Sequence, residues 1–391
     1  MKRDTASAVQ PPKELWENDA QDSSLSTEDS REFYASQGEL VRWRFSRHKM
    51  AVISLCLLAL LYFVAIFADF LAPYGAQTRF AEYQYARPTK IHWTRPDGQA
   101  FGAYVYRLTR TLDTETYEYV FEEDPELPPV RLKFLVRGNS YKFLGLWRSD
   151  LHLFGPAESD APLFLFGSDQ LGRDLFTRVL HGARISLSIG LVGVFLTFIL
   201  GILIGSVSGY FGGVVDEIVQ RVIDFLLAIP GLPLWMTLAA AVPRDWPTLK
   251  TYFAITVILS IIGWCGLARV VRGKLLQLRE EDYALAAKGA GASDWRIITH
   301  HLLPGFTSHL IVSITFSIPS MILSETSLSF IGVGIQPPAV SWGTLLQDSQ
   351  DLMAVAKYNW LLIPALWIIA TVLLFNFVGD GLRDAADPYS R

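Results

Sequence analysis

The chain alternates long uncharged apolar segments with shorter polar ones, a pattern typical of proteins that cross a membrane several times. A helix needs about 20 mostly apolar residues to cross a hydrocarbon layer about 30 Å thick. Only one of the segments that meet this requirement is interrupted by a charge, at Glu325, which makes it the weakest. The sequence predicts an all-α polytopic membrane protein with six transmembrane helices, over residues 50–68, 185–215, 225–243, 251–268, 310–330 and 358–379.

Basic residues beside these segments predict the orientation of the chain, because lysine and arginine accumulate on the cytoplasmic side of membrane proteins. They crowd the front of the first segment, and the loop after the fourth segment contains Arg269, Arg272, Lys274, Arg279, Lys288 and Arg296. With six spans, both observations place the N- and C-termini in the cytoplasm. The lead before the first segment is too long and too acidic for a signal peptide, so we expect an uncleaved anchor.

The polar stretches divide the chain into four parts. Residues 1–40 are predicted to be a disordered cytoplasmic tail, residues 41–75 hold the first helix with its basic flank, and residues 166–391 hold the other five helices. Residues 76–165 are too many for a structureless loop, so we expect a small extracytoplasmic insert domain.

This insert has strand patterns. Residues 130–137 alternate apolar with basic side chains for most of their length, and Gly138-Asn139 predicts a turn into a return strand over residues 141–143. Further strands are expected around residues 104–108 and 117–121, so the insert is predicted to be mostly β. Its aromatic side chains are expected either to form its core or to contact a partner.

Three glycines in the second span, Gly201, Gly205 and Gly209, lie at four-residue spacing and therefore on one helix face. Such a face lets another backbone approach closely. The sequence does not decide whether this face packs against another helix of the same chain or forms a dimer contact.

Composition narrows the kinds of binding and metal sites that the chain is expected to have. The chain is 51% hydrophobic, and its net charge of −4 gives no indication of nucleic-acid binding. The two cysteines, Cys56 and Cys265, lie in apolar segments, so we expect neither a disulfide framework nor a zinc site. The adjacent His300 and His301 would point in different directions on a helix, and no metal site is expected.

The loop after the fourth span has the pattern of two short helices separated by a bend. The acidic residues 280–282 suit the positive end of a first helix, which Gly289 and Gly291 would end. Ser293 is placed to cap a second helix with Asp294 in its first turn. A rigid helix–turn–helix on the cytoplasmic face suits docking into a cleft of a soluble partner; a purely structural loop is the alternative.

This loop resembles the EAA loop of permease subunits of bacterial ABC importers, in which a helix couples the permease to an ATPase subunit. The likeness rests on Ala286-Ala287, Gly291 and Leu303-Pro304, whereas Leu285 stands where the family pattern has glutamate. The resemblance implies that residues 280–304 are an ATPase-coupling loop whose functional residues are Tyr283, Ala286, Ala287, Gly291, Ala292, Ser293, Asp294, Leu303 and Pro304.

A second stretch, residues 166–187, resembles the segment that enters the second span in C-type permease subunits of oligopeptide, dipeptide and nickel importers. Its charges place it at the outer interface, where Arg173, Asp174, Arg178 and Arg184 are expected to pair; an interfacial helix anchored by its arginines is the alternative. Residues 324–343 and 381–388 resemble the same family. The residues of this outer-interface motif are Gly167, Asp169, Gly172, Arg173, Asp174, Arg178, Gly182 and Arg184.

Glu325, with Ser329 one helical turn later, is the carboxylate that interrupts the fifth apolar segment. Ionisable residues inside a span are candidates for function. Both residues are candidates for the translocation path or its gate; the alternative is that Glu325 hydrogen-bonds a neighbouring helix.

The resemblance implies a type I ABC importer permease without catalytic residues or a cofactor of its own. The sequence contains no G-x-x-x-x-G-K-[ST] phosphate loop, so ATP is expected to be used by two separate ABC ATPase subunits. The other implied partners are a homologous second permease subunit, an extracytoplasmic substrate-binding protein and the lipid of the bacterial inner membrane.

Peptides are the expected cargo, with nickel, opines and oligosaccharides left open. A secondary transporter driven by an ion gradient is the alternative from another class, although it would normally show repeated halves and ionisable residues at the membrane midplane. An intramembrane enzyme would need a nucleophile with a base, or a zinc motif, and the spans contain neither.

Overall fold

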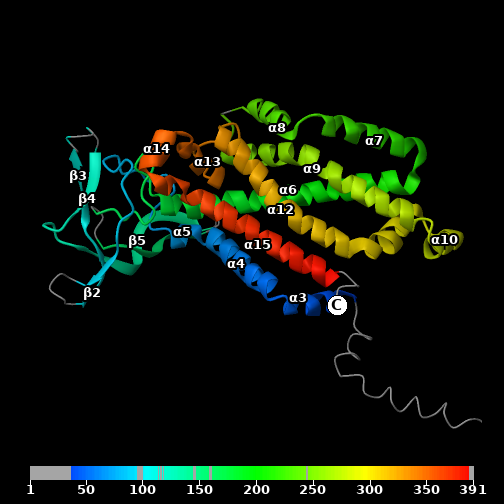
Figure 1. The fold of residues 1–391 in the computed structure, drawn as a ribbon, viewed down its shortest axis with the longest axis horizontal. Helices are drawn as coiled ribbons and strands as arrows, with labels where there is room; N and C mark the ends of the chain where they lie inside the picture. Colours follow the sequence, from blue (N-terminus) through cyan, green and yellow to red (C-terminus); the bar gives the residue numbers. More distant parts are fainter. Residues whose placement is uncertain are drawn as a thin grey trace, which may run out of the picture.

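The computed structural model describes residues 37–386 except 95–99, 113, 115–116, 118, 144–146, 158–160 and 244. Residues 1–36 of the predicted disordered tail lie outside the described residues. The prediction is wrong for residues 37–40, which form the start of a helix. The molecule is elongated, with a unit of β-strands at one end, a helical bundle in the middle and a short helix, α10, at the opposite end (Figure 1).

Five of the described helices are long and apolar enough to span a membrane. They are α4 (Lys49–Ile66), α6 (Leu175–Phe211), α9 (Thr248–Leu278), α12 (Thr307–Ile331) with the short helical segments before it, and α15 (Ile363–Ala386) with the turn before it. The prediction of membrane-spanning helices at these places is confirmed. Two short helices, α3 (Gln37–Arg47) and α5 (Ala68–Leu71), flank α4, and the end of α15 lies beside α3 (Figure 1).

The span predicted over residues 225–243 is not a single helix. The chain forms α7 (Gly213–Ala228) and α8 (Gly231–Ala240), which meet at an angle of 84°. Ile229 is extended and Pro230 follows it, since a residue before proline is disfavoured in the helical region. The count is therefore five spans, or six if this bent pair is one span.

The second predicted span also has different limits. α6 begins ten residues earlier than the predicted start at residue 185, and its 37 residues make it about 55 Å long at 1.5 Å per residue. It ends where Gly212 and Gly213 adopt positive φ angles of 66° and 55°, which favour glycine. α6 therefore extends beyond the hydrocarbon layer and reaches both ends of the bundle.

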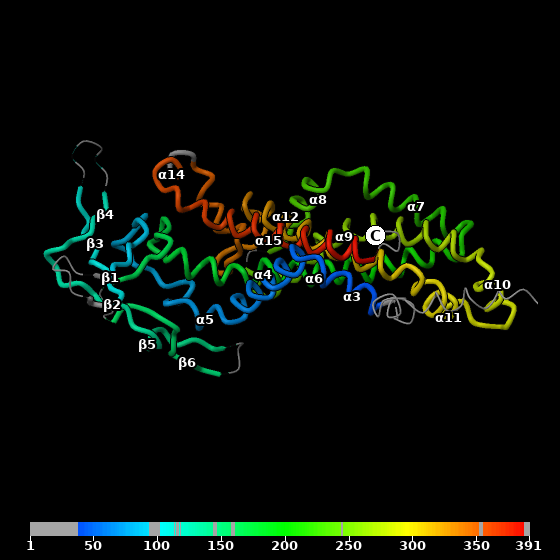
Figure 2. Tube along the Cα trace, turned by 60° about the horizontal axis from the view of Figure 1, so that its bottom comes forward, coloured from blue at the N-terminus to red at the C-terminus, as the bar shows by residue number. Residues whose placement is uncertain are grey.

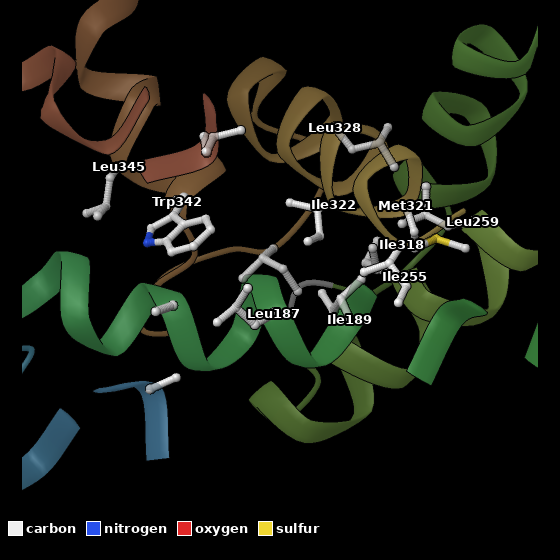
Figure 3. Close-up of a cluster of buried hydrophobic side chains, with 14 of the residues drawn as sticks. Leu187, Ile189, Ile255, Leu259, Ile318, Met321, Ile322, Leu328, Trp342 and Leu345 are labelled. Atoms are coloured by element: carbon white, nitrogen blue, oxygen red, sulfur yellow. The ribbon is translucent and has the colours of Figure 1, made fainter. Parts of the chain in front are cut away.

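The core of the bundle lies around α6. Figure 3 shows Leu187 and Ile189 of α6 meeting Ile255 of α9 and Ile322 of α12, all fully buried. Trp342 of the short helix α13 (Trp342–Leu346) is also fully buried, and its indole Nε1 donates a 3.1 Å hydrogen bond to the Val179 carbonyl. The chain then continues through the 3₁₀ turn η4 (Gln347–Gln350), α14 (Leu352–Lys357) and the 3₁₀ turn η5 (Asn359–Leu362).

The glycine face of α6 packs inside the chain. A Cβ atom at Gly205 would lie 2.6 Å from the Ala268 carbonyl oxygen of α9, and one at Gly209 would lie 2.7 Å from that of Arg272. A Cβ at Gly201 would meet the Leu267 side chain. Because α9 already occupies this face, it is not free for dimerisation, and the packing alternative holds.

The β unit confirms the expectation of a β-rich insert. Its larger sheet has the antiparallel order β1 (His92–Thr94), β2 (Ala100–Val105), β5 (Val130–Phe143) and β6 (Trp147–Pro156). A separate antiparallel pair joins β3 (Arg107–Leu112) and β4 (Tyr119–Asp124). Tyr104 and Phe121 are buried in the β unit, as expected for core residues, whereas Tyr117 and Tyr119 are exposed.

The turn predicted at Gly138-Asn139 is wrong. β5 continues through these residues with a register irregularity between Arg137 and Tyr141, and its partner strand is β6. Gly138 meets a packing requirement, because a Cβ there would lie 2.8 Å from the His152 ring of β6. The sequence does not distinguish a glycine that is required by close packing from a glycine that is required by a turn.

Candidate coupling loop and substrate path

The coupling loop, residues 280–304, lies at the end of the bundle opposite the β unit (Figure 2). It forms α10 (Asp282–Gly289), a bend, α11 (Asp294–Arg296), the π-helical turn η2 (Ile297–Leu302) and the start of the 3₁₀ turn η3 (Leu303–Phe306). Two helical segments separated by a bend are what the sequence predicted. Ser293 occupies the N-cap position of α11 as expected, but its side chain makes no capping hydrogen bond.

The bend is a complete Schellman motif. The amide of Gly291 donates to the Lys288 carbonyl at 3.0 Å, and the amide of Ala292 donates to the Ala287 carbonyl at 3.1 Å. Gly291 has a φ of +81°, where side chains are strained, although a Cβ there would meet nothing within 4 Å. Backbone conformation, not space, therefore requires glycine at this position.

Three large apolar side chains of the coupling loop are exposed. Tyr283, Leu285 and Trp295 are 44%, 50% and 56% exposed, whereas Ala284 between two of them is buried. Ala287 and Ala292 pack instead against a buried cluster formed by α9 and the turns before α12. Leu303 packs against the same cluster, and Pro304 stands in the first turn of η3. Large apolar side chains that are exposed on an ordered loop are suited to contact with another protein.

Hydrogen bonds tie the coupling loop to the end of α6. The Tyr210 hydroxyl donates to Oδ1 of Asp294 at 2.7 Å. Arg279, which precedes α10, donates from Nη1 to the carbonyls of Gly209 and Tyr210, both at 3.1 Å. These contacts join the coupling loop directly to the end of α6.

A large cavity opens beside this end of the bundle. It has a volume of about 970 Å³ and is lined by α6, α9, α12 and α15. Its cationic side chains are Lys274 and Arg383, and His309 and several serines add polar groups. The remaining lining is largely apolar, with Phe198 and Phe316 among the larger side chains.

Glu325 is not in the lining of this cavity. It is fully buried, and the hydroxyls of Ser329 and Ser186 donate to its two oxygens at 2.7 and 3.2 Å. Ser186 also accepts a 3.1 Å hydrogen bond from the Trp342 amide. This geometry makes Glu325 the centre of a polar joint between α6, α12 and α13.

At the β end of the bundle, Asp169 is the centre of a buried ion cluster. It accepts a 2.7 Å hydrogen bond from Nε of Arg173 and a second one from Nη1 of Arg178. All three side chains are almost fully buried. Arg173 and Arg178 therefore do pair with an aspartate, but the partner is Asp169 and not the expected Asp174.

Asp174 does not join this cluster. Its Oδ2 accepts a 2.8 Å hydrogen bond from the Thr177 amide, so its side chain caps the start of α6. Burial raises the pKa of this carboxyl to about 7, against the opposing effect of the Thr177 hydrogen bonds. The expectation that Asp174 pairs with these arginines is wrong, because its position directly before α6 lets it cap the free amides of the first helical turn.

The ion-pair partner of Arg184 lies outside the outer-interface motif. Its Nη2 lies 2.9 Å from Oδ2 of Asp69, just after α4, and His181 Nε2 lies 3.0 Å from Oδ1 of the same residue. Burial opposes ionisation of Asp69, but the hydrogen bonds from His181 and Arg184 outweigh it and lower its pKa. This pair of contacts fixes the first span against α6.

The three glycines of the outer-interface motif permit close contacts. Gly167 and Gly172 have positive φ angles of 79° and 70°, and a Cβ at Gly172 would collide with the Phe80 carbonyl. Gly182 faces Trp342, where a Cβ would lie 3.2 Å from the indole. These glycines let the start of α6 pack against the insert and α13.

A second, polar cavity of about 740 Å³ lies at the β end. Its charged lining residues include Arg79, Arg173, Arg178, Asp348 and Asp351. Burial and the nearby charge of Asp169 raise the pKa of Asp348, whose Oδ1 accepts a 2.8 Å hydrogen bond from Gln170.

Among the described residues, no group of three or more histidine, cysteine, aspartate or glutamate side chains is placed to hold a metal ion. The ring of His300 contacts the Thr299 hydroxyl.

Comparison with known proteins decides the family. Residues 201–391 match the family model of the binding-protein-dependent transport system inner membrane component, and residues 36–88 match that of the N-terminal transmembrane domain of oligopeptide transport permease C. The chain is 42% identical over 226 residues to the dipeptide transport system permease protein of Bacillus subtilis strain 168, covering 58% of this chain and 69% of that protein. The chain belongs to this permease family.

Two more relatives are similar over comparable lengths. The oligopeptide transport system permease protein of B. subtilis strain 168 is 41% identical, and the match covers 58% of this chain and 72% of that protein. The glutathione transport system permease protein of Pectobacterium atrosepticum is 39% identical, covering 57% and 71%. A solved structure of the MetNI methionine ABC transporter in an inward-facing conformation has a TM-score of 0.42 and 18% identity, covering 53% of this chain and 95% of that chain.

The matched regions contain most of the permease features described above. The coupling loop, Glu325 and most of the lining of the large cavity fall within residues 201–391, and α3 to α5 fall within residues 36–88. The strands of the β unit, from His92 to Pro156, lie outside both matches. The resemblance inferred from the motifs is confirmed, and the β unit is an addition to it.

Sequence reasoning missed three residues that hold the permease together. Tyr210 gave no signal, because its partner Asp294 is 84 positions away. Asp69 did offer one, since it is a lone carboxylate directly after an apolar segment. Asp348 gave none, because its proximity to Asp169 depends on the path of the chain through α13.

Proposed function

We propose that this chain is one of two permease subunits of an ATP-driven importer of short peptides. The names of its relatives mention dipeptides, oligopeptides and glutathione. The cavity of about 970 Å³ is within the usual size range of small-molecule sites and offers Lys274 and Arg383 to a carboxylate. These features favour a peptide over a bare metal ion, for which the described residues offer no ligand cluster.

The observation that carries this proposal is that three large apolar side chains of the coupling loop, Tyr283, Leu285 and Trp295, are exposed. We assign ATP binding and hydrolysis to two separate ATPase subunits, each of which holds the coupling loop of one permease subunit. When the ATPases close, they would displace the loop. The hydrogen bond between Asp294 and Tyr210 would then move α6, which forms part of the cavity wall.

The same proposal sets the orientation. The coupling loop and both termini would face the cytoplasm, and the β unit would lie on the outer side of the bacterial inner membrane. A substrate-binding protein would deliver the peptide at that side, close to the polar cavity with Arg79 and Asp351. The homologous second permease subunit would complete the path.

Co-purification with the ATPase subunits tests whether the coupling loop is their docking site. The double variant Leu285→Ala/Trp295→Ala should lose most of the associated ATPase, because both exposed side chains are removed. Trp246→Ala is the matched control, since Trp246 is also exposed but lies between α8 and α9, far from the coupling loop along the chain. Retention of the ATPase by the double variant would exclude the coupling loop as its docking site.

A further inference from the structure

The end of the β5–β6 hairpin lies next to the end of the first membrane span. Phe143, the last residue of β5, has its ring centroid 5.3 Å from that of Phe67. Phe67 directly follows α4, and its ring lies 4.4 Å from that of Phe63, which is exposed on α4. Because the 18 residues of α4 are about 27 Å long, they nearly fill a hydrocarbon layer of about 30 Å. Phe67 and Phe143 therefore lie at the level where hydrocarbon meets lipid headgroups.

The residue opposite Phe143 is Trp147, the first residue of β6. Its side chain is 68% exposed. Tryptophan concentrates at membrane interfaces, because its ring has an apolar body and a polar N–H. An exposed tryptophan paired with a phenylalanine that touches a span is the arrangement expected of an interfacial anchor.

The next pair along the hairpin is Lys142 opposite Arg148. Both side chains are exposed, and like charges directly opposite each other destabilise a strand pair. Neither side chain forms an ion pair with an acidic group in the part of the chain that the structure describes. An anion held between the two cations would remove this repulsion.

The hairpin is held firmly against the chain that leaves the span. Nδ1 of the buried His152 lies 2.6 Å from the Ala72 carbonyl oxygen, and Nε2 lies 3.0 Å from that of Asn139. The Asn139 side chain donates to the Thr78 hydroxyl at 2.7 Å. β5 and β6 also lie beside α5 (Figure 2). The depth of the hairpin end is therefore fixed by α4.

We propose that the end of the β5–β6 hairpin is a membrane anchor that binds anionic phospholipid. Phe143 and Trp147 enter the boundary between headgroups and acyl chains, and Lys142 and Arg148 bind the lipid phosphate. The anchor holds the β unit at a set height and tilt over the bundle. This role belongs to the added β unit and is independent of the cargo.

Tryptophan fluorescence of the full chain in nanodiscs tests the depth of the hairpin. The matched control for Trp147 is Trp93, which is 67% exposed and lies in β1 at the opposite edge of the same sheet. The fluorescence lost in the variant Trp147→Phe should be strongly quenched by lipids brominated near the headgroup and weakly by acrylamide in water. The fluorescence lost in Trp93→Phe should show the reverse. If brominated lipid quenches Trp147 no better than Trp93, the anchor is excluded, and the exposed ring is left for a protein partner.

A second measurement tests the choice of lipid. Brominated phosphatidylglycerol should quench Trp147 more than brominated phosphatidylcholine at equal bromine content. This preference should fall by about fivefold for each charge removed in Lys142→Gln and Arg148→Gln. Lys133→Gln is the control, since Lys133 is exposed on the same strand away from the hairpin end and should leave the preference unchanged. An equal preference in the double variant and the wild type would contradict the anionic site.

Discussion

The Tyr210 hydroxyl donates a 2.7 Å hydrogen bond to Oδ1 of Asp294 and so joins the end of α6 to the coupling loop. Arg279 reinforces this junction through the carbonyls of Gly209 and Tyr210. α6 has 37 residues and reaches the ion cluster at the β end through its first turn. A single rigid element thus connects the two ends of the molecule, and the junction at Tyr210 is where an ATPase would act on it.

Removing the hydroxyl in Tyr210→Phe should lower uptake per ATP hydrolysed. A hydrogen bond to a charged group contributes about 1 kcal/mol or more, so at this exposed site we expect a loss of roughly fivefold. Uptake and ATP hydrolysis measured in the same proteoliposomes give this ratio. Asp294→Ala should cause a similar loss, since it removes the acceptor of the same hydrogen bond. The double variant should lose little more than either single variant. Fully additive losses would mean that the two residues act independently.

Gly291→Ala should impair coupling, because alanine at a φ of +81° is strained by about 1–2 kcal/mol. Gly289→Ala is the matched control: Gly289 is the last residue of α10, its φ is not positive, and a Cβ there meets nothing within 4 Å. Gly291→Asn should be intermediate, since asparagine tolerates the left-handed region better. The increase in ATP hydrolysis on addition of substrate should be measured for all three variants. Equal activity of the two alanine variants would show that the Schellman bend is dispensable.

Asp169→Asn should destabilise the β end of the bundle. It removes the negative charge between Arg173 and Arg178, and breaking a buried ion pair typically costs about 3–5 kcal/mol. Thermal unfolding of the purified protein in detergent measures the loss. Glu217→Gln serves as the control, since Glu217 pairs with Arg221 at an exposed site where a pair contributes about 0–1 kcal/mol. A Tm for Asp169→Asn equal to that of the control would refute the structural role of the cluster.

Glu325→Gln should retain most uptake. A glutamine amide can still hydrogen-bond Ser186 and Ser329, because a serine hydroxyl both donates and accepts. Glu325→Ala should instead lose about 1–3 kcal/mol of stability, since both hydroxyls lose their buried partner. Uptake and thermal unfolding should be measured on both variants. Loss of uptake by a stably folded Glu325→Gln protein would indicate that the charge itself acts in the translocation path.

The sequence predicted the features that depend on local pattern. Apolar segments located the spans, and the glycines at 289 and 291 located the bend of the coupling loop, because each signal is complete within a few residues. The 84° break between α7 and α8 was missed, although Pro230 marked it, because hydropathy does not register a change of direction. The partners of Arg184 and Tyr210 were missed because they lie on distant elements. Gly138 was misread because close packing on His152 and a turn demand the same residue.

Uptake of a labelled peptide into proteoliposomes tests the central claim most directly. The complex would contain this chain, its second permease subunit and the two ATPase subunits, with the binding protein supplied on the side of the β unit. We predict uptake that requires ATP on the side of the coupling loop, that stops in the Leu285→Ala/Trp295→Ala variant, and that is insensitive to collapse of ion gradients. Uptake by this chain without ATP, driven by an ion gradient alone, would contradict the account.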